Sequence, residues 1–388
     1  MKTYDWIVIG GGITGSALSY ELIKKGLRVL LLEKDPNLNN ATRLSYGGLS
    51  YWSATDNLSR ELCQEGREIQ QNLSEELAAN TEFREVDLML VISSEDTPET
   101  IAKTYQKFAI KPQLLTPQEA CEREPLLNPN AMSGCLQLPH GHINPQKTNN
   151  AYQQAFLRLG GEIKYETVTQ FLGQKEKIAG VQTLSEKHYS KNTVVCAGGL
   201  TRLLLKTVGI NVNIYFTHSQ SIVTPPLDIH LRTLVMPSAL QRLMLEEKSR
   251  DVEQQSCWNH PSSNIIADTM EPGAIQFMDG SFSLGQISQI CPDTQANIDR
   301  NRSEERIRQS VGKILPSLQN IPGKLHHCLV AFCPDSNFLV GQIEGFQGLH
   351  IFSGFTSPLV FVPPLARHFA SWVTENHEKL PVITADSF

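Results

Sequence analysis

Apolar and polar positions in the first 34 residues follow the order strand, turn, helix, strand. An apolar run at residues 6–9 leads into six residues of which four are glycine. Residues 16–25 then repeat apolar positions at helical spacing until Gly26, and the run 27–33 barely alternates, as in a strand buried on both faces. This order predicts a strand–helix–strand unit with two parallel strands.

Beyond this unit the pattern changes twice along the chain. A segment rich in Asn, Ser, Thr and Gly covers residues 37–57 and precedes a charged helix expected at 58–79; a loop of that length indicates function rather than simple connection. Short strands and turns between 215 and 288, with Pro225-Pro226 and Asp279-Gly280, predict an antiparallel sheet. Further strands are expected at 86–93, 162–168, 178–181 and 193–196, with a helix between 145 and 160.

Charge and composition narrow the classes of function. Lys plus Arg total 34 against 40 Asp plus Glu, so the net charge is −6, and no basic block is present to neutralise nucleic-acid phosphates. The most apolar early segment, 7–23, contains three adjacent glycines and Glu21, which argues against a membrane span. It also lacks a small-residue cleavage site, so it is better explained as strand, turn and helix than as a signal peptide. The eight cysteines lack paired CxxC spacing, so we expect neither a disulfide framework nor a zinc site. A soluble, cytoplasmic protein is expected.

Three glycines and one acidic residue form the clearest chemical motif. In Gly10-x-Gly12-x-x-Gly15 the first glycine permits a tight turn, the second lets a pyrophosphate approach the backbone, and the third allows close packing of helix on strand. The helix that starts near Thr14 offers free N–H groups to the phosphates. Glu33, which ends the second strand, is placed to accept hydrogen bonds from ribose hydroxyls. The motif predicts dinucleotide binding and does not by itself distinguish FAD from NAD.

Motifs along the whole chain resemble the D-amino acid oxidase family of FAD-dependent oxidoreductases, which includes glycine oxidase, monomeric sarcosine oxidase and D-amino acid dehydrogenase. The resemblance spans residues 4–373. It is carried by the glycine motif with Glu33-Lys34, Ala41-Thr42-Arg43-Leu44-Ser45-Tyr46-Gly47-Gly48, Gly141-His142-Ile143-Asn144-Pro145, Val194-Val195-Cys196-Ala197-Gly198-Gly199, Asp279-Gly280-x-x-x-Leu284-Gly285, Pro334-Asp335-x-x-x-x-Val340-Gly341 and Gly348-Leu349-His350-Ile351-Phe352-Ser353-Gly354-Phe355.

The resemblance implies an α/β fold of two domains. An FAD-binding, Rossmann-like domain of the glutathione-reductase type would comprise residues 1–84, 141–214 and 327–388. A second, α+β substrate domain containing an antiparallel sheet would comprise 85–140 and 215–326. The last cofactor segment, 354–359, would place a helix N-terminus at the flavin pyrimidine edge and stabilise negative charge on the reduced ring.

The family's cofactor contacts carry over to a defined set of positions. Arg43 could contact a pyrophosphate, the flavin or an anionic substrate, or be a solvated loop charge. The set is Gly10, Gly12, Ile13, Thr14, Gly15, Glu33, Lys34, Thr42, Arg43, Ser45, Tyr46, Gly47, Gly48, Val168, Ala197, Gly198, Leu200, Cys328, Gly354, Phe355, Thr356, Ser357, Pro358 and Leu359.

Cys328 stands six residues before Pro334. In the sarcosine oxidase branch the cysteine at this spacing is bonded to a methyl group of the flavin ring, so the resemblance implies covalent FAD at Cys328. The alternative is a buried cysteine within the apolar segment 328–332, since cysteine is among the most buried residue types. Cys333 has no matching position in the family pattern.

Two family solutions for binding a substrate carboxylate are missing. The arginine that glycine oxidase has four residues before the Pro-Asp pair falls on Val330, and the segment 355–362, where the sarcosine oxidase branch has a lysine, contains no basic residue. The oxygen-activating lysine of that branch falls on Ser283. A small zwitterionic amino acid is therefore a less secure substrate than the fold suggests, and the term oxidase is equally weakened.

An aromatic and imidazole set is expected to shape the substrate pocket. Either histidine of the set could orient a substrate or accept a proton, because His titrates near neutral pH, or could be structural. The aromatic rings could form a substrate cage or pack in the core. The set is Tyr46, Tyr51, Trp52, Tyr215, His218, His327, Phe355 and Phe361, of which Tyr51, Tyr215, His218, His327 and Phe355 are the candidate catalytic residues.

The expected reaction is oxidation of a C–N bond by hydride transfer to FAD, followed by hydrolysis of the imine. The expected partners are a small amine or acid as substrate and oxygen or another electron acceptor. A 2-hydroxy acid dehydrogenase of the same fold, a flavin-binding protein without catalysis and an NAD-dependent dehydrogenase are the alternatives.

Overall fold

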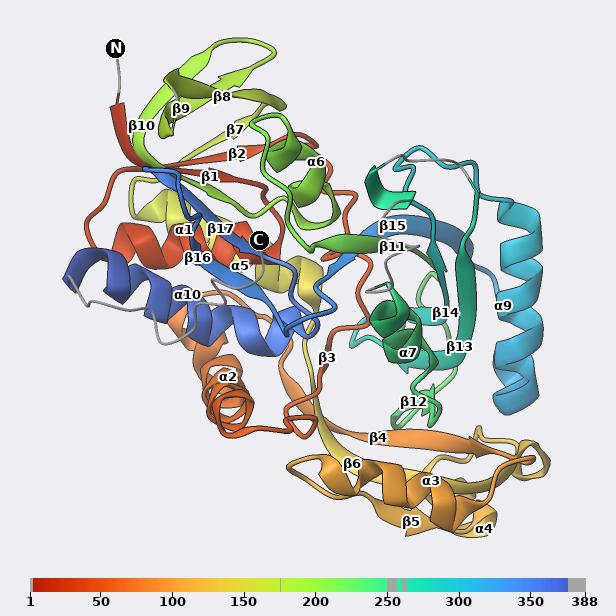
Figure 1. Ribbon diagram of the computed structural model, residues 1–388. Helices are drawn as coiled ribbons and strands as arrows, with labels where there is room; N and C mark the ends of the chain where they lie inside the picture. The colour runs from red at the N-terminus through yellow and green to blue at the C-terminus, as the bar shows by residue number, and fades with distance from the viewer. Residues whose placement is uncertain (1–2, 175, 250–256, 260–263, 376–388) are drawn as a thin grey trace.

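The computed structural model describes residues 3–174, 176–249, 257–259 and 264–375, which form two sheets with helices packed on them (Figure 1). The first sheet has the path β16-β17-β10-β1-β2-β7, with β8 and β9 continuing from β10. Its central pairs are parallel, and β1 and β2 are apolar and largely buried. Its strands are β1 (Thr3–Ile9), β2 (Val29–Glu33), β7 (Glu162–Tyr165), β8 (Val168–Gln174), β9 (Lys177–Thr183), β10 (Lys187–Val195), β16 (Leu339–Gln342) and β17 (Leu349–Ser353).

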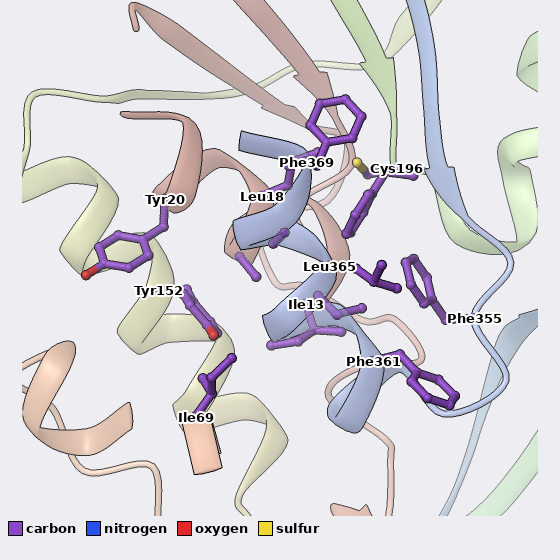
Figure 2. Close-up of a cluster of buried hydrophobic side chains, with 14 of the residues drawn as sticks. Ile13, Leu18, Tyr20, Ile69, Tyr152, Cys196, Phe355, Phe361, Leu365 and Phe369 are labelled. Atoms are coloured by element: carbon purple, nitrogen blue, oxygen red, sulfur yellow. The ribbon is translucent and has the colours of Figure 1, made fainter. Parts of the chain in front are cut away.

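Four helices pack together on one side of this sheet: α1 (Ile13–Lys24), α2 (Asn57–Glu76), α5 (Pro145–Arg158) and α10 (Pro358–Glu375). Local sequence sets where they begin, because the side chain of Asp56 caps α2 and that of Asn144 caps α5. Figure 2 shows the core between them, where side chains from all four helices meet Cys196 and Phe355. This core holds the glycine turn and the start of α10 in fixed positions.

The second sheet has the path β15-β11-β14-β13-β12-β4-β6-β3, with β5 paired to β6, and its pairs are antiparallel except β12–β4. Helix α9 (Arg300–Ile314) packs on β13, β14 and β11, whereas α7 (Gln241–Lys248) packs on β13 from the side that faces the first sheet (Figure 1). The strands are β3 (Gly48–Leu49), β4 (Arg84–Ser93), β5 (Gln113–Leu115), β6 (Met132–His142), β11 (Tyr215–Val223), β12 (Leu234–Pro237), β13 (Ala267–Gln276), β14 (Phe282–Ile290) and β15 (Lys324–Phe332).

Short helices complete the connections. They are α3 (Pro98–Thr104), α4 (Pro117–Arg123), α6 (Thr201–Lys206) and the single turns η1 (Tyr105–Lys107), η2 (Pro129–Ala131), η3 (Gly198–Leu200) and η4 (Pro316–Leu318). In the ranges that the structure describes, no helix is both long and apolar enough to cross a membrane.

The predicted fold class is confirmed, because a mainly parallel α/β layer is joined to a mainly antiparallel sheet. The division into domains stays a prediction, and two strands depart from it. β15 pairs in the second sheet, so the boundary expected at residue 327 falls inside a strand, and β3 of the segment 1–84 pairs with β6. Residues 1–2 and 376–388 of the expected first domain lie outside the described residues.

Candidate functional site

The turn between β1 and α1 is shaped to receive an anion. Gly10 has φ +112°, and a Cβ there would lie 2.4 Å from the carbonyl oxygen of Cys196; at Gly15 a Cβ would lie 1.9 Å from the carbonyl oxygen of Gly10. Gly12 caps α1 without a side-chain hydrogen bond, and the first turn of the helix has no acidic residue. The helix N-terminus therefore keeps its positive partial charge available for a phosphate.

The loop 37–57 reaches this turn. The Ile13 N–H donates to Thr42 Oγ1 at 3.0 Å, and the Thr14 hydroxyl donates to the carbonyl oxygen of Cys196 at 3.3 Å. The structure thus brings together the predicted pyrophosphate residues of the turn and Thr42. Arg43 is exposed, and its guanidinium donates to Asn37 and Asn39 within the same loop.

Glu33 ends β2 beside the turn. Its Oε2 accepts the Gly11 N–H at 2.6 Å and its Oε1 accepts the Asp35 N–H at 2.8 Å. The residue is buried, with 8% of its surface accessible, while Lys34 is exposed. A carboxylate held in this way retains lone pairs for ribose hydroxyls. Together with the open helix N-terminus, this donor and acceptor set fits the phosphate and ribose parts of a dinucleotide.

The carboxyl end of β10 lies on the other side of the glycine turn. Ala197 precedes η3, which runs from Gly198 to Leu200; Ala197, Gly198 and Leu200 are partly accessible, whereas Gly199 is buried. Gly198 has φ +53°, and no atom lies within 4 Å of the position that a Cβ would occupy. Val168 begins β8 and is also partly accessible. These predicted contacts leave room for a ligand along the ends of the parallel strands.

The segment 354–359 adjoins the loop 37–57. Gly354 has φ +76°, the Thr356 N–H donates to the carbonyl oxygen of Asn337 at 3.0 Å, and the hydroxyl oxygens of Ser357 and Ser50 lie 3.1 Å apart. Pro358 and Leu359 then begin α10. The structure therefore places the start of α10 beside the loop that follows Thr42, as a shared cofactor contact requires.

The end of the loop contacts the second sheet. The Gly47 N–H donates to Ser45 Oγ at 3.2 Å, and a Cβ on Gly48 would lie 2.6 Å from His140 Nε2. The hydroxyl of Tyr46 is buried without a hydrogen bond among the described residues, and burial followed by the charge of Glu271 raises its pKa. Tyr46 thus connects the loop 37–57, which we call the cofactor loop, to the second sheet.

One row of side chains crosses four strands of the second sheet. Cys328 on β15 pairs with Ser219 on β11, Ser219 pairs with Ser288 on β14, and Ser288 pairs with Thr269 on β13. Directly paired residues project on the same side of a sheet, so these four share a face, which we call the Cys328 face. It also carries His326 and Val330, which alternate with Cys328 along β15. Burial raises the pKa of the Cys328 thiol to about 12.

His218 and His327 project from the opposite face. His327 pairs with Gln220, and Gln220 alternates with His218 and Ile222 along β11. Ile222 packs with Ile307 and Val311 of α9, so the two histidines share the face that α9 covers. The structure therefore separates them from Cys328, and their predicted catalytic role gains no support from this placement.

These two histidines hydrogen-bond to each other. Their rings stack with centroids 5.0 Å apart, and His218 Nδ1 lies 2.8 Å from His327 Nε2. His218 Nε2 lies 3.1 Å from the carbonyl oxygen of Cys291. Because a carbonyl oxygen can only accept, we assign the proton of His218 to Nε2, and His327 Nε2–H then donates to His218 Nδ1. Burial lowers the pKa of His218, and burial together with His218 lowers that of His327 to about 4.

The predicted aromatic set is divided among three places. Phe355 and Phe361 are buried in the hydrophobic core between the first sheet and its helices (Figure 2). Tyr51 belongs to the same core, with its ring under Arg67. Trp52 lies in another cluster, and its Nε1 donates to His140 Nδ1 at 3.0 Å. Tyr215 packs against Trp258 and Phe332. The described structure does not gather these rings into one cage.

Sequence reasoning missed three residues: His326 and Ser219, which lie on the Cys328 face, and Arg242, which lies on α7 above it. Burial, then Arg43, lowers the pKa of His326, which places this imidazole near the cofactor loop. Alternation along β15 could have identified it, because residues 326 and 328 share a face and residue 327 does not. No signal in the sequence indicates that α7 docks on this face.

The chain is similar to solved and curated enzymes over nearly all of its length. Glycine oxidase from Bacillus cereus ATCC 14579 superposes with a TM-score of 0.79 at 19% identity, covering 99% of this chain and 98% of that one. The 4-methylaminobutanoate oxidase (formaldehyde-forming) of Paenarthrobacter nicotinovorans is 23% identical over 95% of this chain and 43% of its own length. Mitochondrial dimethylglycine dehydrogenase of Homo sapiens is 22% identical over 98% of this chain and 44% of its own length.

This chain therefore spans less than half the length of those two curated relatives. The family model of the FAD-dependent oxidoreductases called DAO matches residues 5–372. That match covers the glycine turn, Glu33, the loop 37–57, the Cys328 face and the start of α10, which are the features assembled above. The chain belongs to the DAO family of FAD-dependent oxidoreductases.

Proposed function

We propose that this protein oxidises a C–N bond of an amine or amino acid, with N-methylated amino acids as the first candidates. The observation that carries the proposal is the similarity, over 95% and 98% of this chain, to two enzymes named for 4-methylaminobutanoate and dimethylglycine. The family membership supplies the cofactor, FAD. When bound, FAD would supply the acceptor for a hydride from the carbon next to nitrogen, and the resulting imine would be hydrolysed by water.

The residues of this chain hold the cofactor at three places. Glu33 accepts hydrogen bonds from the adenosine ribose, and the N-terminus of α1 binds the pyrophosphate together with Thr42. The start of α10 would direct its positive end to the flavin ring. Held in this way, the ring would face the Cys328 face, and this face would orient the substrate.

The Cys328 face is suited to positioning rather than to acid–base catalysis. It carries the hydroxyls of Ser219, Ser288 and Thr269, of which Thr269 donates to Gln241 and Ser288 accepts from Gln286. Hydroxyl groups can orient a polar substrate without removing a proton. Hydride transfer needs the substrate carbon to lie close to the flavin. The lone pair of a neutral amine assists the loss of hydride from the neighbouring carbon. The enzyme therefore contributes orientation and exclusion of water.

We also propose that Cys328 joins a methyl group of the flavin ring through a thioether. The C–S bond would replace the S–H bond and one methyl C–H bond, and the two electrons released would reduce the ring itself, which the enzyme's electron acceptor would then reoxidise. The thiol shares the face expected to meet the ring, and it is separated from His218 and His327 by the strand itself. Acid precipitation tests this. Wild type is expected to keep its yellow colour in the pellet, and Cys328→Ala is expected to release it to the supernatant. Cys333→Ala, which removes a buried thiol five positions along the chain, is the matched control and keeps the colour. Colour retained in the Cys328→Ala pellet contradicts the assignment.

Anaerobic reduction of the bound flavin tests the proposed function. The panel is N-methylated amino acids, D-amino acids, simple amines and 2-hydroxy acids, each mixed with protein in the absence of oxygen. Bleaching by amines supports C–N oxidation, whereas bleaching by 2-hydroxy acids alone assigns C–O oxidation, for which His326 supplies an imidazole on the Cys328 face. A flavin that none of them reduces contradicts both. Admitting oxygen afterwards shows whether it or another acceptor reoxidises the flavin.

A further inference from the structure

Helix α7 covers the Cys328 face close to the cofactor loop. The Thr269 hydroxyl donates to Gln241 Oε1 at 2.7 Å, and the Arg242 N–H donates to Glu271 Oε1 at 3.3 Å. Thr269 is the β13 member of the row that contains Cys328. With strands about 4.8 Å apart, Thr269 lies about 14 Å from Cys328, within the span of a flavin ring and its substrate.

The cofactor loop approaches the same helix from the other side. Tyr46 packs in the same hydrophobic cluster as Leu240, the residue that precedes α7. Glu271 also contributes to the raised pKa of Tyr46. The beginning of α7 is therefore in contact with both the Cys328 face and the cofactor loop.

Arg242 presents a guanidinium with unused donors at this position. Its Nε lies 3.7 Å from Glu246 Oε1, and no acceptor lies within hydrogen-bond distance of the guanidinium in the described ranges. The side chain keeps 28% of its surface accessible, whereas that of Glu246 keeps 7%. The charge of Glu246, and more weakly that of Glu271, raises the pKa of Arg242, so it stays a cation.

Three other arginines near the two sheets each donate a hydrogen bond to a backbone carbonyl. Arg84 donates to the carbonyl oxygen of Gln276, Arg202 to that of Val212, and Arg43 to that of Asn37. Val330, on the Cys328 face, is apolar and offers nothing to an anion. The guanidinium of Arg242 is thus the one we single out for a ligand.

We infer that Arg242 binds the carboxylate of the substrate, and that the substrate is an amine that carries an acid group. The inference rests on the proposed oxidation of a C–N bond. Glu246 holds the Nε side of the guanidinium, which leaves the terminal nitrogens as a planar fork for two carboxylate oxygens.

The test compares each acid with its uncharged ester. The concentration dependence of anaerobic flavin reduction is measured for 4-methylaminobutanoate and for its methyl ester. Arg242→Gln is expected to raise the half-saturating concentration of the acid about 100-fold, because a charge-assisted pair is lost, and to change that of the ester less than twofold. Arg242→Lys, which keeps the charge and loses the fork, is expected to raise the former about tenfold. Lys248→Gln, a cation at the end of the same helix, is the control and changes neither.

A purely structural Arg242 gives a different result. Parallel weakening of acid and ester, or no change in either, overturns the inference. Flavin content and thermal midpoint check that each variant is folded, and Arg242→Lys carries the comparison if Arg242→Gln does not fold.

A binding measurement separates this inference from the proposed function. Butanoate and butanamide are titrated calorimetrically into the oxidised holoenzyme, which needs no turnover. Butanoate binding that disappears in Arg242→Gln supports the anion site even if no amine reduces the flavin. Reduction by amines together with butanoate binding that is equal in wild type and Arg242→Gln overturns the Arg242 site and leaves the proposed function standing.

Discussion

Replacing Glu33 by glutamine tests whether the acidic end of β2 holds the cofactor. In the free protein its two carboxylate oxygens accept the N–H groups of Gly11 and Asp35 at 2.6 and 2.8 Å. Glutamine keeps one acceptor oxygen, so one buried N–H loses its partner. A hydrogen bond to a charged group contributes about 1.5–3 kcal/mol, so the free energy of unfolding is expected to fall by about that amount.

The same change weakens cofactor binding. Loss of one hydrogen bond from a ribose hydroxyl to a charged acceptor corresponds to about 1.5–3 kcal/mol, or about 10- to 150-fold in Kd. The assay is an FAD titration followed by fluorescence quenching, performed in a Cys328→Ala background so that binding is reversible. Asp35→Asn is the matched control, because Asp35 is acidic, partly exposed and accepts the N–H groups of Asn37 and Asn39. A Kd within about twofold of the parent protein, or an equal loss in Asp35→Asn, would refute the reasoning.

Two further predictions concern the glycine turn and the buried histidines. Gly15→Ala would place a Cβ 1.9 Å from the carbonyl oxygen of Gly10, so we expect a lower thermal midpoint and little bound flavin; an unchanged midpoint with full flavin content contradicts this. Burial lowers the pKa of His140 to about 3, below the value of about 6.5 in the unfolded chain, so the folded protein binds fewer protons between those values and its free energy of unfolding falls as pH drops through them. Urea midpoints measured from pH 7 to pH 4.5 should therefore decline less steeply in His140→Gln than in wild type or in the exposed control His230→Gln, and equal slopes in all three would contradict it.

The parts of the site that lie close together in sequence could be predicted from it. The glycine turn, α1 and Glu33 form one local unit whose spacing reflects the geometry of a strand–helix–strand crossover. Cys328 was identified through its distance from Pro334, and the structure places it on the face that α7 and the cofactor loop approach. Its bond to the flavin stays a prediction.

The parts that depend on sheet register or on docking could not be predicted in the same way. His327 follows His326 by one residue, and that single step moves its side chain to the face of the sheet under α9. Arg242 and Glu271 are 29 positions apart and meet because α7 packs on β13. Phe355 and Phe361 were expected to line the substrate pocket, but both pack in the hydrophobic core. An aromatic ring is suited to either place, so residue type alone does not distinguish them.

A single-turnover product measurement tests the central claim most directly. The purified protein is mixed anaerobically with N,N-dimethylglycine or 4-methylaminobutanoate, and the flavin absorbance and the aldehyde released are measured together. Oxidation at an N-methyl carbon followed by hydrolysis predicts one formaldehyde for each flavin reduced, with the demethylated amine as co-product. A flavin that stays oxidised with every amine, or that is reduced by 2-hydroxy acids alone, contradicts the account.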